Sequence, residues 1–362
     1  MGAKVLYSVR IPLFLRNFIP MRHLLVLLYL ILSFSCTENQ QRQPFVDVEI
    51  ETVYEDSLSI RAIEIMGGSL AFAADKGTFG SIDLTSGKVR TNIKKHDSLT
   101  PHFRAVAHTS TDFFMLSIAN PALLFKTGSS SQMELVYEEE DESVFYDAMT
   151  FWNDKEGIAV GDSMNGCLSI IITRDGGLTW QKLPCSNLPA AIEGEGAFAA
   201  SNTNIEVKGN KTWVATTAGR IYFSSDKGKS WDIQTTPIVS KEPTQGIYSI
   251  DFYDEGVGVA FGGDYTAPED NTGNKAITKD GGSTWHLIAD GQDPNYKSCV
   301  QFVPNSEGKE LLALGFTGIS YSSDQGNTWT ELSKEPFYTI RFKNDSVAYA
   351  AGKNRISKLV FK

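Results

Sequence analysis

The chain has 362 residues, of which 33 are Lys or Arg and 43 are Asp or Glu, so its net charge at pH 7 is −10. This negative balance repels phosphate backbones and argues against nucleic-acid binding. The five His residues are scattered and no CxxC or HExxH spacing occurs, so we expect neither a metal site nor a cofactor.

Residues 1–35 have the composition of a secretory signal peptide. They contain four basic residues and no acidic ones, and an apolar run over residues 24–32 follows Met21. This run is shorter than the roughly 20 residues that a membrane-spanning helix needs. Because Met21 alone begins a complete signal, residues 1–20 can precede the true start.

Cys36 follows this signal at the position of a lipoprotein cleavage site, although Ser33 stands where Leu is usual. We therefore expect Cys36 to be lipidated, residues 36–44 to form a tether, and the protein to be anchored in the bacterial cell envelope, facing the periplasm or the exterior. Plain secretion and an ordinary transmembrane anchor are the alternatives.

Residues 45–362 read as an all-β domain, because short alternating apolar segments are separated by Gly, Asn and Asp turns. A strand followed by a small-residue strand recurs seven times, which predicts a seven-bladed β-propeller. The expected first strands of the seven blades begin at Arg61, Arg104, Asp147, Glu195, Tyr248, Ser298 and Tyr338.

The seventh unit has room for only three strands before Lys362. Residues 45–54 alternate like a strand and belong to no other unit. We expect them to supply the missing fourth strand and so to close the ring, which would cover an exposed sheet edge.

One phrase, [ST]-x-D-x-G-x-[ST]-W, occurs four times, and we call each copy a repeat turn. The Asp and the hydroxyl side chains can bond backbone amides and close a tight turn, while the Gly supplies a positive φ. The Trp is expected in the core between units. The Asp and Trp residues of the four copies are Asp175 and Trp180, Asp226 and Trp231, Asp280 and Trp285, and Asp324 and Trp329.

The repeat turn is identified as the Asp-box, or bacterial neuraminidase repeat. Together with the segments at 145–152, 157–162, 194–201 and 262–265, it makes residues 58–361 resemble bacterial propellers similar to the photosystem II stability and assembly factors. Members of that group often carry the label "oxidoreductase", but no dinucleotide fingerprint or redox site stands behind it here. The resemblance implies a seven-bladed propeller and a binding scaffold, and it implies no reaction.

The first positions of the seven expected inner strands should form a polar ring at one mouth of the channel. Arg61 and Arg104 would face Asp147 and Glu195 there, with Tyr248 and Tyr338 nearby. One interpretation is a binding site in which the arginines hold a carboxylate or phosphate. The other is a self-satisfied network that only fills the channel.

The fifth blade carries the longest internal insertion, residues 263–275. Longer loops often carry function, so Asp264, Tyr265 and Asn274 are further candidates for ligand binding. The alternative is a solvated surface loop.

Three cysteines follow Cys36, and an odd number argues against a disulfide framework. Cys167 and Cys185 fall in one unit and can pair, but we expect buried free thiols by default.

We therefore expect a monomeric, non-catalytic propeller that is tethered to the membrane by lipid alone. We expect it to bind a protein partner or a small anionic or glycan ligand, with a role as an assembly factor. The alternative is a sialidase-like glycoside hydrolase, for which Arg61, Arg104, Tyr248, Tyr338, Asp147 and Glu195 supply the residue types. That alternative fits less well because sialidases have six blades.

Overall fold

The computed structural model describes residue 2 and residues 42–128 and 132–362. The expected signal segment, the lipidation site Cys36 and most of the tether therefore lie outside the described residues. Phe45–Lys362 form one compact unit. Within the described part of the chain, no helix has the length and apolar character needed to cross a membrane.

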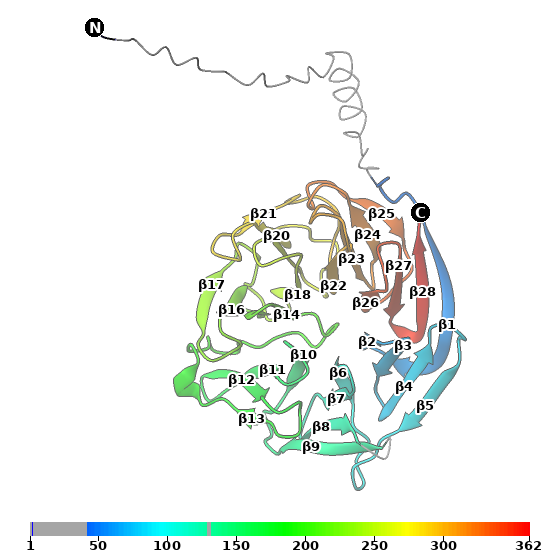
Figure 1. The fold of residues 1–362 in the computed structure, drawn as a ribbon, viewed down its shortest axis with the longest axis vertical. Helices are drawn as coiled ribbons and strands as arrows, with labels where there is room; N and C mark the ends of the chain where they lie inside the picture. Colours follow the sequence, from blue (N-terminus) through cyan, green and yellow to red (C-terminus); the bar gives the residue numbers. More distant parts are fainter. Residues whose placement is uncertain (1, 3–41, 129–131) are drawn as a thin grey trace. The chain divides into compact units, whose positions relative to one another are not determined.

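Seven antiparallel sheets of four strands each surround a common centre (Figure 1), so the expected all-β class and seven-bladed propeller are confirmed. Blade 1 contains β2 (Ala62–Met66), β3 (Ser69–Ala73), β4 (Thr78–Asp83) and β5 (Val89–Ile93). Blade 2 contains β6 (Phe103–His108), β7 (Phe113–Ser117), β8 (Ala122–Thr127) and β9 (Met133–Glu139). Blade 3 contains β10 (Tyr146–Phe151), β11 (Gly157–Met164), β12 (Cys167–Thr173) and β13 (Gln181–Lys182).

The other blades follow the same order from the centre outward. Blade 4 contains β14 (Ile205–Lys208), β15 (Lys211–Ala215), β16 (Arg220–Ser224) and β17 (Asp232–Thr235). Blade 5 contains β18 (Ile247–Phe252), β19 (Gly258–Gly262), β20 (Lys275–Thr278) and β21 (His286–Leu287). Blade 6 contains β22 (Cys299–Phe302), β23 (Leu311–Gly315), β24 (Gly318–Ser322) and β25 (Thr330–Ser333).

Blade 7 is built from both ends of the domain. Its strands, from the centre outward, are β26 (Thr339–Phe342), β27 (Val347–Ala351), β28 (Lys353–Phe361) and β1 (Val48–Ser59). β1 pairs with β28 from Val48 opposite Phe361 onward. The Phe45 ring, just before β1, packs on the Phe361 ring with 4.9 Å between centroids. The expected ring closure by the N-terminal strand is thus confirmed.

The core lies between neighbouring blades, because each sheet buries both faces. Trp213 of blade 4 stacks on Phe252 of blade 5 with 3.7 Å between ring centroids, and both side chains are buried. Three of the repeat-turn tryptophans, Trp180, Trp231 and Trp285, are likewise buried, whereas Trp329 is half-buried. The expectation that these rings pack in the core is confirmed for the first three.

The four repeat turns share one hydrogen-bond pattern. In the first, Asp175 Oδ1 accepts the Thr179 N–H at 3.0 Å and Oδ2 accepts the Thr179 hydroxyl at 2.6 Å. The N–H of Gly177, at φ +79°, donates to the Thr173 hydroxyl at 2.9 Å. Asp226, Asp280 and Asp324 make the corresponding bonds in the other copies. These bonds therefore fix the geometry of the turns.

Blade 4 corrects the sequence-based assignment. Its inner strand was expected at Glu195–Ala199, but it is β14 at Ile205–Lys208. Glu206 pairs with Trp213 as Asp251 of blade 5 pairs with Val259. Glu206 and Asp251 therefore occupy equivalent positions in their blades. Tyr248, the expected first position of the blade 5 strand, lies three residues before Asp251, so its equivalent in blade 4 is Thr203 and not Glu195.

The cysteines also differ from the default expectation. Cys167 and Cys185 form a disulfide, with 5.5 Å between their Cα atoms, whereas Cys299 is free and buried. Cys167 begins β12, and Cys185 begins the 3₁₀ helix η1 (Cys185–Asn187). The disulfide therefore anchors the start of the long connection from β13 to β14.

Candidate functional site

The last part of the connection from β13 to β14 lies against the inner strands. We call residues 196–204 the plug. The side chain of Ser201 donates to the Ser298 carbonyl at 2.6 Å, and Asn202 Nδ2 donates to the Val106 carbonyl at 2.8 Å. Asn202 Oδ1 accepts the Met149 N–H at 3.0 Å. The plug is therefore bonded at the inner strands of blades 2, 3 and 6, which explains why a segment without strand structure is largely buried.

Arg61 and Arg104 lie where the inner strands begin, at the end of the channel that we call the mouth. Arg61 Nη1 donates to the Ala200 carbonyl at 3.3 Å, and Arg104 Nη1 donates to the Ala199 carbonyl at 3.4 Å. The plug thus holds both guanidinium groups side by side at the mouth. Arg61 also stacks over the Tyr338 ring, with 4.0 Å from its Cζ to the ring centroid.

Neither arginine has an acidic partner among the described residues, although other arginines such as Arg220 and Arg341 do. Burial, and then repulsion from Arg61, lower the pKa of Arg104. A guanidinium nevertheless stays charged in proteins. The mouth therefore carries two adjacent positive charges with no carboxylate of the described residues in salt-bridge contact, although the more distant Asp147 and Asp75 act electrostatically on Arg104.

Asp147 does not neutralise this pair. Its side chain is buried, and neither carboxyl oxygen has a hydrogen-bond partner. Burial, reinforced by repulsion from Asp162, raises the pKa of Asp147 well above its usual range, so the neutral acid is favoured. Arg104 and the Ala199 N–H oppose this shift, but neither reaches hydrogen-bond geometry with the carboxyl.

Glu195 does not neutralise it either. It is buried, and it accepts a bond from Arg220 Nε at 3.1 Å and one from the Thr216 hydroxyl at 2.7 Å. The Tyr222 hydroxyl lies 3.3 Å from Glu195 Oε2, but the Tyr222 side chain is fully buried. This Tyr–Glu pair is therefore closed to a substrate, which disfavours a sialidase-type nucleophile at this position.

Aromatic side chains form one wall of the mouth. Phe198 of the plug stacks on Tyr248 with 3.7 Å between centroids, and Tyr296 meets Tyr248 edge to face at 4.8 Å. The Tyr248 hydroxyl donates to the Thr244 carbonyl at 2.6 Å, so this ring is held within the wall. Tyr265 remains 49 % exposed.

The blade 5 insertion is ordered by its own polar residues. Asp264 accepts bonds from the N–H and hydroxyl of Thr266, at 2.8 and 2.6 Å. Asn274 donates to the Pro294 carbonyl at 3.2 Å and accepts a bond from Lys275 at 2.7 Å. Both side chains are buried, so of the three loop candidates only Tyr265 presents its side chain to solvent.

Three residues farther along the inner strands, a second polar ring is internally paired. Arg341 Nε lies 2.9 Å from Glu64 Oε1, and Lys208 Nζ lies 3.0 Å from Glu206 Oε1. Asp251 accepts the Phe302 N–H at 2.6 Å. Opposite charges meet within this ring, so it has less capacity for an outside anion than the mouth.

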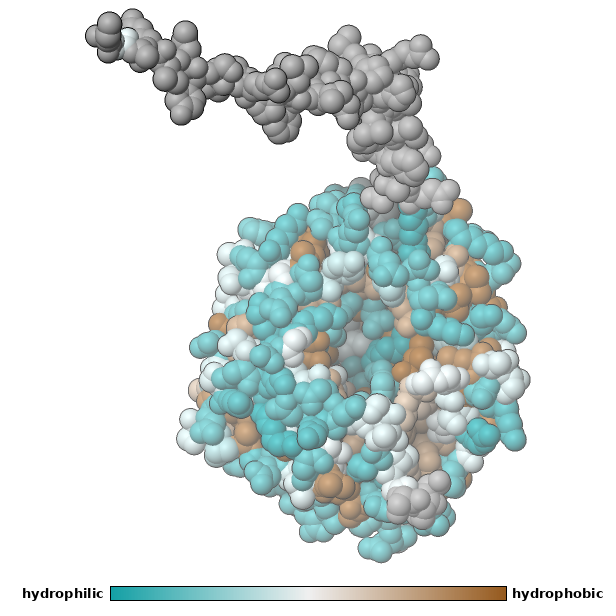
Figure 2. Space-filling model, in the orientation of Figure 1, coloured by the Kyte–Doolittle hydropathy of each residue, from teal (hydrophilic) through white to brown (hydrophobic). Residues whose placement is uncertain are grey.

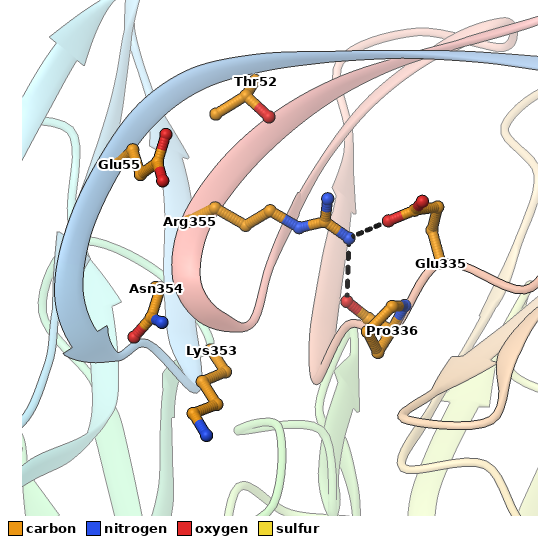
Figure 3. Close-up of a pocket in the computed structure, with 7 residues that line it drawn as sticks. All are labelled: Thr52, Glu55, Glu335, Pro336, Lys353, Asn354 and Arg355. Carbon is orange, nitrogen blue, oxygen red and sulfur yellow. Dashed lines mark hydrogen bonds and ion pairs between the residues drawn. The ribbon is translucent and has the colours of Figure 1, made fainter.

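A groove of about 590 Å³ beside β1 and β28 also contains an arginine, Arg355, which can be compared with the arginines of the mouth (Figure 3). The Arg355 guanidinium donates to Glu335 at 2.6 Å and to the Pro336 carbonyl at 3.3 Å. Arg355 is thus already neutralised, unlike Arg61 and Arg104.

In the space-filling view, hydrophilic residues gather in the hollow at the centre of the propeller (Figure 2).

The sequence prediction omitted three residues that shape the mouth. Phe198 belongs to the plug, and Arg220 pairs with Glu195. The sequence analysis assigned residues 195–199 to a strand of blade 4, so it predicted neither contact. His102 lies two residues before Arg104, and its Nε2 is 3.5 Å from Arg104 Nε. The sequence indicated this contact only through their spacing, because residues two positions apart in an extended segment lie on the same face.

No protein-family model matches the chain, and no curated protein matches it. Solved structures do match its fold. A structure described as YCF48 bound to D1 peptide has a TM-score of 0.61 at 12 % identity, covering 89 % of this chain and 100 % of that chain. The RRP9 WD40 repeats give 0.60 at 12 % identity, covering 88 % and 99 %. YCF48 from Cyanidioschyzon merolae gives 0.60 at 11 % identity, covering 87 % and 98 %. At these identities the likeness establishes the propeller fold alone.

Proposed function

We propose that the protein is a non-catalytic binding scaffold whose channel mouth holds an anionic group of a protein partner. The observation that carries this proposal is the pair Arg61 and Arg104, which lie together at the mouth without a salt bridge to any carboxylate of the described residues. The two acidic residues expected beside them form no salt bridge with them, because Asp147 is buried and Glu195 is paired with Arg220.

The chemistry of the mouth suits a carboxylate or a phosphate. A guanidinium presents a planar set of donors that can hold two oxygens at once, and backbone carbonyls already orient one nitrogen of each arginine. The Tyr338 ring under Arg61 and the exposed Tyr265 add surfaces of the kind found at protein interfaces.

The fold supports a protein partner over a free anion. One similar propeller is described as bound to a D1 peptide, and the seven-bladed scaffold offers the same kind of surface here. We carry the idea of an assembly role to this chain as part of the proposal, together with the Asp-box identity of its repeat turns.

The location is also proposed. The signal-like residues 1–35 and Cys36 support a lipid-anchored protein outside the cytoplasm. The disulfide between Cys167 and Cys185 supports the same location, because such bonds persist in oxidising compartments.

The test is a crosslinked pull-down from membranes with the wild type and the double variant Arg61→Ala/Arg104→Ala. We expect the double variant to lose the partner that the wild type recovers. Arg174→Ala is the matched control, since Arg174 is a more exposed arginine paired with Glu156 at 3.0 Å. Recovery of the same partner by wild type and double variant would place the interface elsewhere.

A fluorogenic sialoside assay separates this proposal from the hydrolase alternative. No turnover is expected. Turnover that Asp147→Asn abolishes would overturn the scaffold proposal, because a buried, unpartnered acid would then have a catalytic role.

A further inference from the structure

A cavity of about 260 Å³ lies beside Arg104. The segment leading into β6 and the turn between β7 and β8 form most of its lining, and both lie where β6 begins, at the mouth. The lining combines the apolar side chains of Leu99, Pro101, Ile118, Pro121 and Leu123 with polar residues such as Thr100 and Asn120. The cavity therefore offers apolar contact surface close to a charged arginine.

The walls of this cavity are fixed by hydrogen bonds. The Ser117 hydroxyl donates to the Pro121 carbonyl at 3.3 Å and accepts the Leu123 N–H at 2.8 Å. The Ile118 N–H donates to the His102 carbonyl at 3.0 Å, which joins the two segments. The cavity is therefore formed before any partner arrives, so little ordering would oppose binding there.

His102 connects the cavity to the arginine pair. It lines the cavity, and its Nε2 lies 3.5 Å from Arg104 Nε. Burial, and then the charge of Arg104, lower the pKa of His102, which favours the neutral ring. A group bound at Arg104 and a side chain in the cavity would thus be separated by one uncharged imidazole.

The lip of the cavity is apolar as well. The Leu99 side chain is 43 % exposed, although Leu123 at the base is almost fully buried. A partner side chain entering the cavity would cover Leu99 and remove further apolar surface from water.

We propose that the mouth recognises a segment of a partner protein in which an anionic group stands next to an aliphatic or aromatic side chain. The anionic group binds Arg61 and Arg104, and the apolar side chain enters the cavity lined by Leu99, Ile118 and Pro121. This inference rests on the proposed function, since it assigns the second half of the motif held at the same mouth.

The test uses a library of end-blocked random hexapeptides on beads, sorted for binding to the complete protein. The wild type should enrich Asp, Glu or phosphoserine next to Leu, Ile, Val or Phe. Leu99→Ser and Ala119→Trp alter the cavity at exposed positions, so both should fold. We expect them to lose the apolar preference, with about tenfold weaker binding of the selected peptides, while the acidic preference remains.

The controls separate the two proposals. Leu178→Ser, at a leucine that is 64 % exposed on the first repeat turn, should leave the selected motif unchanged. Arg61→Ala/Arg104→Ala should lose the acidic preference. Acidic enrichment without an apolar neighbour in the wild type would overturn this inference alone. No acidic enrichment at all would overturn the proposed function and this inference with it.

Discussion

Arg220 holds the buried side chain of Glu195 in an ion pair, with 3.1 Å between Arg220 Nε and Glu195 Oε1. Glu195 lies just before the plug, and Arg220 begins β16 of blade 4. The pair therefore fixes the entry of the plug into the channel. It also keeps Glu195 away from Arg61 and Arg104, so the organisation of the plug and the free charge at the mouth have the same cause.

Replacing Glu195 with Gln should destabilise the fold. The Glu195 side chain has no exposed surface, so the variant leaves the charge of Arg220 largely without its partner. We expect a loss of about 3 kcal/mol in the free energy of unfolding, measured by urea denaturation. Glu335→Gln is the control, because its pair with Arg355 is 52 % exposed on the carboxylate side and should cost less than about 1 kcal/mol. Equal losses in the two variants would argue against a special role of the Glu195 pair.

Removing residues 45–54 should be far more damaging than removing residues 37–44. The first deletion strips most of β1 from β28 and exposes the core around Phe45 and Val48. We expect the midpoint of thermal unfolding to fall by on the order of 10 °C or more. The shorter chain without 37–44 serves as the control and should unfold near the wild-type temperature. Matching midpoints for the two deletions would show that β1 adds little to the closed ring.

The propeller was predictable because most of its information is local. Alternation of apolar residues located β10 and β18 within one residue, and the repeat turns marked the connection between the third and fourth strands of four blades. The plug was not predictable in this way. The small residues of 194–201 resemble a strand, and only distant partners such as Ser298 and Val106 decide otherwise. Hydrogen bonds between blades overrode the local pattern.

The candidate site was predictable only in part for the same reason. The positions of Arg61 and Arg104 follow from the strand alignment, but the withdrawal of their acidic neighbours depends on tertiary contacts. Asp147 is buried, and Glu195 is paired with Arg220. Disulfide connectivity likewise depends on geometry, so a count of cysteines could not establish the Cys167–Cys185 pair.

The disulfide should contribute measurably to stability. It closes a loop with a sequence separation of 18 and ties the start of the connection that forms the plug to β12. Reduction, or the double variant Cys167→Ala/Cys185→Ala, should lower the free energy of unfolding by about 3 kcal/mol. Adding reductant to the double variant provides the control and should change nothing. A wild type whose unfolding is insensitive to reductant would contradict this expectation.

The repeat turns should make the protein sensitive to acid. Bonds from the Thr284 hydroxyl and N–H lower the pKa of Asp280 to about 2, and bonds from Ser230 and Ser224 outweigh partial burial to bring the pKa of Asp226 to about 2. Because the folded pKa lies below the unfolded one, this stabilisation is complete above about pH 4 and is lost as the pH falls toward 2.

The measurement is the thermal midpoint between pH 2 and pH 5. Asp226→Asn/Asp280→Asn should flatten the acid limb relative to the wild type while lowering the midpoint at pH 5. An acid limb of unchanged slope in this variant would show that other carboxylates dominate acid unfolding.

Asp147→Asn should become more favourable as the pH rises. Burial raises the folded pKa of Asp147, so its contribution to stability is fully present below the usual aspartate pKa of about 3.9 and is lost as the pH rises toward the folded value. The Asn side chain has nearly the same shape and no charge to desolvate. The free energy of unfolding of the variant, minus that of the wild type, should therefore be larger at pH 8 than at pH 4.5. Asp232→Asn, at an exposed position of β17, is the control for a general effect of removing a negative charge. If the two variants show the same pH dependence, the inference that Asp147 is buried as a neutral acid is wrong. A charged Asp147 would then offset part of the positive charge of Arg61 and Arg104.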